Sequence, residues 1–464
     1  MKKSLVALAV LAASGAYAQS SVTLFGIVEA TTDIGFNRNI DTRSTTNNVN
    51  SLGLAIAPTG TVASSARQKN SFRIQDGSDQ GSGSSRVGFR GTEDLGGGLK
   101  ADFLLEMGLR IDDGCTTLSA AGGCDNGGNS ANSGGSTFGR NAWGGLSGGF
   151  GEVRLGRQVL GSFGVQGNSG SSGASNGLYD ASTAGLLPMG NVRFSNAIRY
   201  LSPNFGGFTG SLMLAAPETG PSNPTTISST SLVGSPVPAG SASRRIGVDL
   251  ALEYANGPAY IGFGYNKRDT GNVTSSTPAL GVTTNASPGV VNGYTVGGSY
   301  DLGVVKPFIN YTRQTTDIFG STIAATALTN SSNANARALS IGLRAPVGAF
   351  TVIAGYGRLN TRTNEVATST TAGVTTATAL SGEAKRDAFQ LGGQYALSKR
   401  TLIEANYGYS RLRSNGGGSV SNGNLNADGT LATITPASIG ASGNRSFDSN
   451  DRTSSFNVGL KHSF

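Results

Sequence analysis

Apolar and polar residues alternate strictly in many short segments of this chain, and no stretch approaches the ~20 consecutive apolar residues that a membrane-spanning helix needs. The alternation is clearest over residues 455–464, where the apolar phase consists of Phe456, Val458, Leu460, His462 and Phe464. Small or polar residues occupy the positions between them. Because successive side chains of a strand point to opposite faces, this segment is predicted to be a β-strand with one face toward lipid and the other toward water.

A second segment indicates that the polar face borders water. Residues 246–254 place apolar residues on one phase and two acids, Asp249 and Glu253, on the other. Carboxylates within an otherwise apolar strand require solvent on their side of the sheet. About sixteen such segments are predicted, each near the ~10 residues of a tilted transmembrane strand. Further examples are residues 208–214, 294–300, 339–343, 350–356, 389–397 and 403–409.

The connections between these segments alternate between short and long. Seven short turns are predicted at 92–98, 147–151, 202–207, 256–258, 301–304, 345–348 and 397–400. Eight long segments rich in Ser, Thr, Asn and Gly lie at about 35–85, 111–137, 159–193, 217–244, 269–291, 316–337, 362–386 and 413–451. Membrane barrels place short turns on the periplasmic rim and long loops outside the cell. The predicted fold is therefore all-β, a 16-stranded antiparallel transmembrane β-barrel with short periplasmic turns and long extracellular loops.

Aromatic residues gather beside the short turns, as the interfacial girdle of a membrane barrel requires. They are Phe150, Tyr200, Phe205, Phe208, Tyr254, Tyr260, Phe308, Phe350, Tyr395 and Phe464. A soluble β-sandwich or propeller is the alternative for a chain with this alternation. Such folds need neither an aromatic rim nor alternating loop lengths.

The N-terminus has the pattern of a secretory signal peptide. Lys2 and Lys3 precede an apolar run at 5–13, and Ala16-Tyr17-Ala18 supplies the small-x-small pattern of a cleavage site. Residues 1–18 are predicted to be removed during export to the cell outer membrane. No linker divides the remainder, so residues 19–464 are predicted to form one barrel. The 71 glycines and 13% charged residues disfavour a soluble helical or α/β enzyme, and 37% hydrophobic residues disfavour disorder.

Five stretches of the chain resemble the general porins of beta-proteobacteria, which are similar to neisserial porins. They are SVTLFGIVEA from Ser21, SRVGFRGTEDLGGGLKADFLLE from Ser85, FGRNAWGGLSGGFGEVRLGRQ from Phe138, NAIRYLSPNFGGFTGS from Asn196 and the terminal VGLKHSF. The resemblance covers strands and turns over most of the chain, whereas the first loop is unusually long and the third lacks an acidic cluster. It implies a homotrimer whose third loop, at about 159–193, folds into the lumen opposite constriction arginines. It also implies that Phe464 helps the outer-membrane assembly machinery to recognise the last strand.

The candidate constriction residues are three arginines on the lumen phase of the second, fourth and sixth strands: Arg86, Arg140 and Arg199. Their positions match the constriction arginines of the family that the chain resembles. Alternatively, they only pair with lumen acids such as Asp102 and Glu106. Within the third loop, residues 159–191 contain one acid, Asp180, and no base, so the field at the constriction is expected to be positive and to favour anions. Weaker candidates are Arg90, Arg110, Arg154 and Arg157.

The only two cysteines, Cys115 and Cys124, both lie in the second long loop. An exported protein meets an oxidising environment, so a disulfide between them is predicted. It would stabilise the loop by roughly 2–3 kcal/mol. A metal site is the alternative, but it needs more ligands than two thiols, and none with suitable spacing lies nearby.

The predicted function is passive diffusion of small hydrophilic solutes and ions, preferentially anions, through a water-filled channel. A substrate-specific outer-membrane channel and a surface adhesin role of the long loops are the alternatives. No enzyme activity is expected: residues 145–149 match G-x-S-x-G, but the sole histidine, His462, lies on the apolar phase of the last strand. The expected partners are two further copies of the chain, outer-membrane lipid and lipopolysaccharide, and the assembly machinery. No cofactor, metal or nucleic acid is expected.

Overall fold

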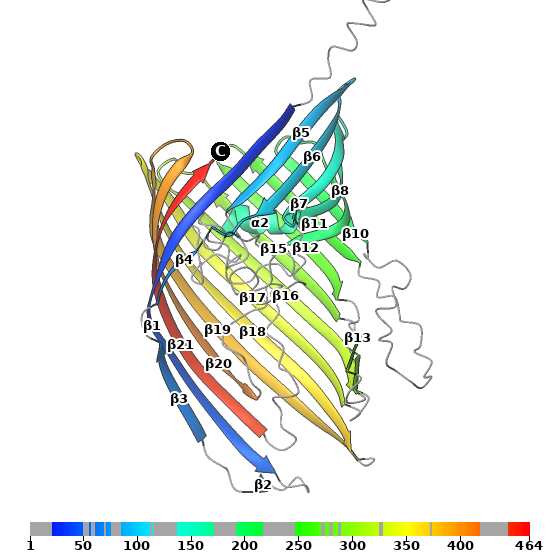
Figure 1. The fold of residues 1–464 in the computed structure, drawn as a ribbon, viewed down its shortest axis with the longest axis vertical. Coiled ribbons are helices and arrows are strands. Elements are labelled where there is room, and N and C mark those ends of the chain that lie inside the picture. Colours follow the sequence, from blue (N-terminus) through cyan, green and yellow to red (C-terminus); the bar gives the residue numbers. More distant parts are fainter. Residues whose placement is uncertain are drawn as a thin grey trace, which may run out of the picture.

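Sixteen long strands pair edge to edge into a closed antiparallel ring in the computed structural model of the protein (Figure 1). They are β1 (Ser21–Val49), β5 (Arg86–Gly96), β6 (Leu99–Gly108), β7 (Asn141–Gly148), β8 (Gly151–Val159), β9 (Arg193–Leu201), β10 (Phe208–Ala215), β11 (Gly247–Asn256), β12 (Ala259–Thr270), β15 (Gly289–Tyr300), β16 (Lys306–Ile323), β17 (Leu328–Val347), β18 (Phe350–Thr371), β19 (Val374–Ala396), β20 (Thr401–Gly417) and β21 (Asn444–Ser463). The structure describes residues 21–49, 55–56, 61–68, 71–75, 85–111, 114, 137–170, 192–216, 246–270, 274–277, 282–285, 289–323, 328–371, 374–417 and 444–464. The predicted fold class is confirmed.

The ring closes where the first strand meets the last. β1 pairs antiparallel with β21 over most of its length, from Ile27 opposite Ser463 to Asn47 opposite Asn444. The backbone N–H of Gly26 donates to the carbonyl of Phe464, and the N–H of Phe464 donates back, both at 3.1 Å. Neither β1 nor β21 therefore has an unpaired edge along this seam. An unpaired edge would expose backbone N–H and C=O groups to hydrocarbon, which offers them no hydrogen-bond partner.

The two faces of the strands differ as the alternation predicts. Leu391, Leu460 and Ile341 are exposed on the outside, whereas Glu29 and Asp249 are 0% exposed on the inside. In a soluble protein the apolar residues would be the buried ones. This inverted distribution identifies the outer face as the one that contacts lipid and the inner face as the lining of a polar lumen.

Most of the predicted aromatic girdle faces outward at the short-turn rim, but two of its members were assigned to the wrong face. Phe308 is only 9% exposed, and it lies on the inward phase of β16 between outward-facing Pro307 and Ile309. Tyr260 also turns inward, where its hydroxyl donates to Glu253 at 2.8 Å. Both residues lie near the start of a strand that follows a short turn. There, the residue at which the strand begins determines which side chains face inward.

The prediction of ~10-residue strands is wrong for the strands on either side of several long loops. β18 and β19 run for 22 and 23 residues, so much of the predicted 362–386 loop is a hairpin. The predicted 35–85 loop includes the end of β1 together with three short strands that pair with β1: β2 (Ala55–Ile56), β3 (Thr61–Gln68) and β4 (Ser71–Gln75). A further hairpin, β13 (Thr274–Thr277) with β14 (Val282–Asn285), lies within the predicted 269–291 loop. Beyond the hydrocarbon the backbone ladder continues, but the apolar phase that marks a strand in the sequence disappears.

All seven predicted short turns lie on one rim of the barrel, at the end where both β1 begins and β21 ends (Figure 1). Glycines make two of these turns tight: Gly97 between β5 and β6 and Gly348 between β17 and β18 both have φ of +62°. Left-handed backbone of this kind favours glycine. The long connections leave the opposite rim. Within the described ranges, no helix is long and apolar enough to cross a membrane.

The lipid-facing position of Leu391 gives a test of the barrel's orientation. Its side chain is 48% exposed on the outer face, midway along the apolar part of β19. Leu391→Arg is expected to lower the free energy of unfolding by about 2–4 kcal/mol, because arginine on the lipid face at mid-membrane depth is costly. The measurement is urea titration of protein folded into liposomes, with Leu391→Ala as the control for lost volume. Equal effects of both substitutions would contradict a lipid-facing position.

Candidate functional site

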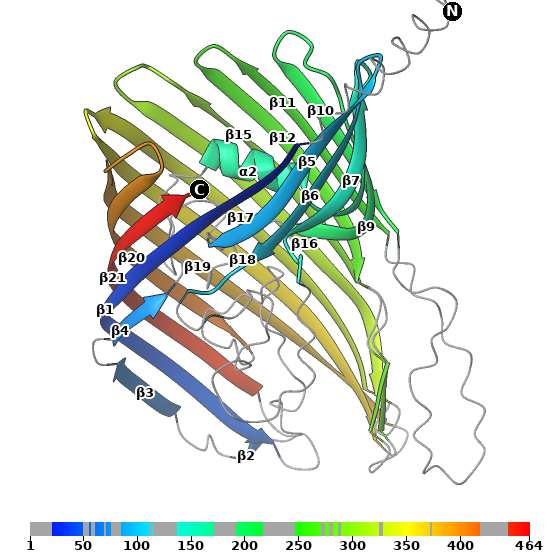
Figure 2. The ribbon, with the colours of Figure 1, turned by 45° about the horizontal axis from the view of Figure 1, so that its top comes forward.

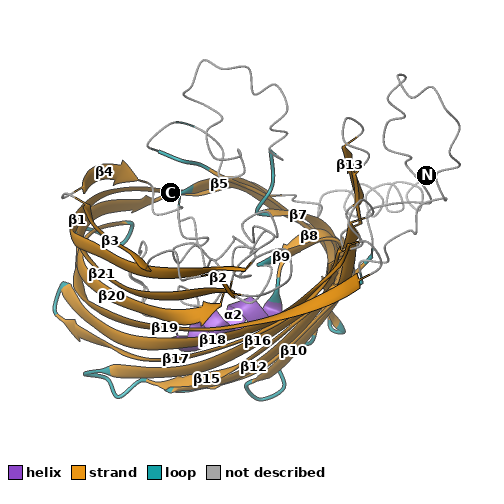
Figure 3. Ribbon diagram, turned by 90° about the horizontal axis from the view of Figure 1, so that it is seen from below, coloured by secondary structure: helices purple, strands orange, loops and turns teal. Residues whose placement is uncertain are grey.

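A short helix, α2 (Gly161–Gly170), lies inside the barrel, between β8 and β9 in the sequence (Figure 2). Viewed from below, it rests against one side of the ring (Figure 3). Its wall is formed by β10, β11, β12, β15, β16 and β17. Every third residue of α2 is a glycine, which is a poor helix former. Contacts with the wall must therefore stabilise this helix.

The lumen acid Asp249 caps the N-terminus of α2. Its carboxylate accepts hydrogen bonds from the N–H of Gly161 at 2.7 Å, from the N–H of Ser162 at 3.2 Å and from the Ser162 hydroxyl. The first N–H groups of a helix have no partner within the helix, and the helix dipole favours negative charge at that end. Asn266 donates to the Ser162 hydroxyl at 3.1 Å and extends this contact to β12. One buried carboxylate thus fixes where the helix begins.

Further along α2, the polar side chains bond the barrel wall. Gln166 donates to Thr312 at 3.1 Å, and Asn310 donates to Ser169 at 2.6 Å. The helix also approaches the wall closely over two glycines. A Cβ atom at Gly262 would lie 2.7 Å from Val165 Cγ1, and one at Gly264 would lie 2.7 Å from Ser162 Cα. Any larger side chain at these two positions would push α2 away from the sheet.

Arg199 supports the segment that leads into α2. Its guanidinium donates to the carbonyl of Val159 at 3.1 Å and to the Ser211 hydroxyl at 3.1 Å. Beside it, Leu160 is buried in a small apolar cluster with Phe194, Ala197, Met213 and Ala215. The arginine is therefore part of the support of the helix.

Arg86 and Arg140 converge on Glu106, on the part of the wall formed by β5 and β6. The Nε of Arg140 donates to the Glu106 carboxylate, Asn141 donates to it at 3.0 Å, and the Nε of Arg86 lies 3.6 Å from it. The Glu106 side chain is 9% exposed and that of Arg86 is 29% exposed. Two guanidinium groups thus share one carboxylate, which leaves the group with positive charge.

Two more arginines lie close to this group. Arg193, at the start of β9, interacts electrostatically with Arg140, Arg157 and Arg86. Arg157 donates to the carbonyl of Gly139 at 2.7 Å and to the Ser195 hydroxyl at 2.5 Å. We call Arg86, Arg140, Arg157 and Arg193, with Glu106, the arginine cluster. Sequence reasoning ranked Arg157 low and missed Arg193, because the ladder between β8 and β9 shifts register at Gly156–Gln158, which local periodicity does not reveal.

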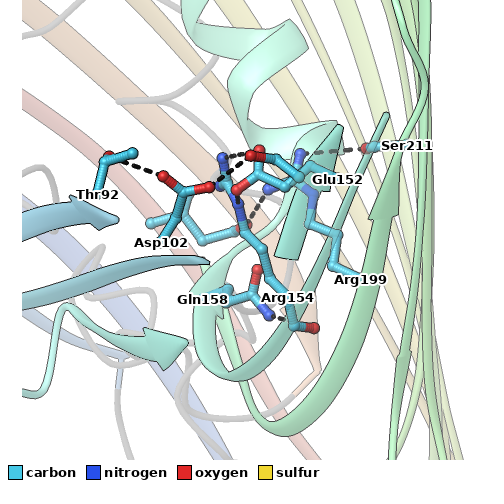
Figure 4. Close-up of polar contacts among 9 residues, drawn as sticks. Thr92, Asp102, Glu152, Arg154, Gln158, Arg199 and Ser211 are labelled. Carbon is cyan, nitrogen blue, oxygen red and sulfur yellow. Dashed lines mark hydrogen bonds and ion pairs between the residues drawn. The ribbon is translucent and has the colours of Figure 1, made fainter. Parts of the chain in front are cut away.

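Other charged side chains of the lumen near the cluster have local partners (Figure 4). Asp102 accepts hydrogen bonds from Thr92 at 2.7 Å and Ser147 at 2.6 Å. Arg154 binds Glu152 through two nitrogens at 2.6 and 2.7 Å. The Arg154 guanidinium also lies over the ring of Trp143, 4.1 Å from its centroid. A bidentate pair adds no net charge to the lumen.

The predicted site residues are thus divided among several places. Arg86, Arg140 and Glu106 lie together, whereas Arg199 and Asp102 have other partners. Phe464 lies at the seam of the barrel. Asp180, Cys115 and Cys124 lie outside the described residues, as does the predicted signal peptide. Among the residues that the structure describes, no group of three or more His, Cys, Asp or Glu could hold a metal ion.

Comparisons with known proteins give a consistent match. A family model described as "Gram-negative porin" matches residues 4–415. Outer membrane porin protein 32 of Delftia acidovorans is 35% identical over 315 residues, which cover 66% of this chain and 68% of the relative. An outer membrane porin protein of Bordetella pertussis is 29% identical over 429 residues, covering 89% and 94% of the two chains. In-vitro folded OmpT, an outer membrane protein of Vibrio cholerae, shares the fold with a TM-score of 0.50 at 13% identity, covering 96% and 98%.

The cap on α2 gives a direct test of how the helix is held. Asp249→Ala removes the acceptor for the first two N–H groups, and loss of a helix cap costs about 0.5–2 kcal/mol. Amide hydrogen exchange over residues 161–170 is therefore expected to accelerate by about 2- to 30-fold. The measurement is exchange detected by mass spectrometry on detergent-folded protein. Asp102→Ala is the matched control, because this lumen acid on β6 bonds Thr92 and Ser147 rather than the helix, and it should leave exchange over α2 unchanged. An unchanged rate in Asp249→Ala would show that the carboxylate does not hold the helix.

Proposed function

This chain belongs to the Gram-negative porin family, and on that premise we propose that it forms a water-filled channel for passive diffusion of small hydrophilic solutes and ions across the outer membrane. The observation that carries this proposal is the closed ring with a polar lining and an apolar exterior. A ring of sixteen strands is too wide for side chains to fill, so water occupies what α2 leaves open.

The proposed constriction lies between α2 and the wall that carries the arginine cluster. Helix α2 occupies the side formed by β10–β12 and β15–β17, whereas the cluster is carried by the chain from β5 to β9. Solutes that pass α2 therefore pass these arginines. Arg199 has a supporting role in this arrangement, because its guanidinium bonds the segment leading into α2.

Anion preference follows from the charge of the arginine cluster. Four guanidinium groups lie around Glu106, and the carboxylate of Glu29, which also acts on Arg86, is bound by Lys461 at 3.2 Å. Fixed positive charge beside a narrow aqueous passage raises the local concentration of anions and repels cations. Pairing of Arg86 and Arg140 with Glu106 orients both side chains without cancelling their charge.

We also propose that the barrel assembles as a homotrimer, contacts the lipid and lipopolysaccharide of the outer membrane, and is inserted by the assembly machinery that recognises Phe464. The resemblance to general porins supports these partners. No catalytic role is proposed, since the sole histidine, His462, lies on the lipid-facing phase at the rim, 2.9 Å from Thr401 Oγ1. The alternative of surface adhesion concerns long loops that lie largely outside the described residues.

Charge substitutions in the cluster are expected to shift ion selectivity in opposite directions. Arg86→Gln with Arg140→Gln should move the reversal potential in a KCl gradient toward potassium, whereas Glu106→Gln should move it toward chloride. The change in permeability ratio is expected to be on the order of severalfold. Lys267→Gln, on the outer face of β12, is the control and should change nothing. Cation preference of the unmodified channel, or shifts of the same sign in both variants, would contradict the proposed constriction.

The ring of Phe464 gives a test of the assembly signal. It packs over Gly26 so closely that a Cβ atom there would lie 2.9 Å from its Cε1. Phe464→Ala keeps both backbone hydrogen bonds of the seam but removes the ring. The expected result is less heat-modifiable, oligomeric protein in outer membranes, measured on gels of unheated and boiled samples. His462→Ala, at the next outward position of β21, should assemble normally. Normal assembly of Phe464→Ala would rule out a recognition role for the ring.

A further inference from the structure

Charged residues cover the outer face of four neighbouring strands just beyond the lipid-facing band. We call these residues of β17–β20 the outer cationic patch, and its cations are Arg337, Arg358, Arg362, Lys385, Arg411 and Arg413. Two acids, Glu383 and Asp387, lie among them. The pore does not account for this patch, because it faces away from the lumen.

The strand register establishes that the patch faces outward. Leu343, Ala354, Leu391 and Tyr407 form one row across β17–β20, and Ile341, Tyr356, Phe389 and Tyr409 form the next row on the same face. The register continues without a shift from these rows into the charged ones. The following rows on that face are Leu339–Arg358–Asp387–Arg411, Arg337–Asn360–Lys385–Arg413 and Asn335–Arg362–Glu383–Asn415. The outer face thus changes from apolar to aromatic to cationic along the strands.

The direction of that change locates the patch on the extracellular side. The short turns that join β17 to β18 and β19 to β20 lie at the opposite, apolar end of the same strands. Aromatic rows mark the boundary between hydrocarbon and headgroups in membrane barrels. Since short turns are periplasmic, the cations lie at the level of the headgroups of the outer leaflet.

The acids do not neutralise the patch. Asp387 is bound by Arg358 at 2.6 Å and Arg413 at 2.9 Å, and the Tyr356 hydroxyl donates to it at 2.8 Å. Glu383 is bound by Arg362 at 2.7 Å, with Lys385 at 3.9 Å. Each carboxylate is shared by two cations. The cationic side chains nevertheless remain open to a ligand, since Arg358, Arg362, Lys385 and Arg413 are 45–74% exposed.

Two shallow grooves run between these side chains. One, of about 310 Å³, is lined by Arg337, Arg362, Glu383 and Lys385 among others. The second, of about 380 Å³, shares Glu383 and Lys385 and adds Arg411 and Arg413. Both volumes lie at the lower end of the range for small-molecule sites. Each groove could take one compact anionic group and surround it with several donors.

We propose that the outer cationic patch binds the phosphate groups of the glycolipid that forms the outer leaflet, lipopolysaccharide. Guanidinium groups bind phosphate oxygens in pairs, and the ammonium of Lys385 adds a point charge between the two grooves. The neighbouring aromatic and apolar rows would contact the acyl chains of the same molecule. This proposal rests on the outer-membrane location and lipopolysaccharide contact proposed above, and it assigns that contact to a defined site on the outer wall.

The test uses a double substitution on the row shared by the grooves. Arg337→Gln with Lys385→Gln removes one arginine and one lysine from the first groove. Lys399→Gln with Arg400→Gln is the matched control, because it removes the same two charges from the exposed turn between β19 and β20 at the other rim. Binding of purified lipopolysaccharide to the folded protein in detergent is measured by a mobility shift. Enzymatically dephosphorylated lipopolysaccharide and free orthophosphate serve as additional probes.

The patch variant is expected to bind lipopolysaccharide about tenfold or more weakly than the unmodified protein, while the control stays within about twofold. The dephosphorylated glycolipid should bind all three proteins weakly and alike. Equal binding by the two variants, undiminished binding of the dephosphorylated form, or full displacement by equimolar orthophosphate would overturn the proposal. So would loss of the oligomer with unchanged glycolipid affinity, since the patch would then be a subunit contact. Single-channel conductance of the same samples separates this outcome from failure of the proposed pore.

Discussion

The structure depends on one constraint: hydrocarbon offers no hydrogen-bond partner, so every backbone N–H and C=O in the membrane must be paired within the protein. The sixteen-stranded ring meets this constraint only because β21 returns to β1 and the N–H and C=O of Phe464 pair with those of Gly26. Once the ring is closed, each strand has one face in lipid and one in water. The apolar exterior and the buried acids Glu29 and Asp249 are consequences of that closure.

Closure of the ring also produces a polar inner wall to which helix α2 can bind. Helix α2 has glycine at every third position and would not be stable alone in water. Its stability comes from the wall, where Asp249 supplies the cap, Asn310 and Thr312 bond its side chains, and Gly262 and Gly264 leave room for it. Polar residues on the inner face of β11, β12 and β16 therefore support the helix.

Charge is distributed on the two faces of the wall in different ways. Inside, Arg154 and Arg199 bond nearby acceptors, while the four cations of the arginine cluster outnumber the carboxylates beside them, Glu106 and Glu29. Outside, cations begin abruptly beyond the aromatic row of Tyr356 and Phe389. An arginine in the lumen acts on solutes in water, whereas one on the outer face acts on the headgroups beside it. The same residue type thus has two roles that depend only on strand phase and depth.

The sequence by itself determined the barrel, its rims and the facing of most side chains, because a period of two is a local property of consecutive residues, as in Leu460 and Asp249. It failed at Tyr260 and Phe308, where strands begin at turns, and at the ends of β18 and β19, where no apolar phase marks the strand. Only the tertiary structure decided that Asp249 caps Ser162 and that Arg193 joins Arg86 and Arg140. Those contacts depend on register between strands and on a bulge in β8, which set distances between residues far apart in the chain.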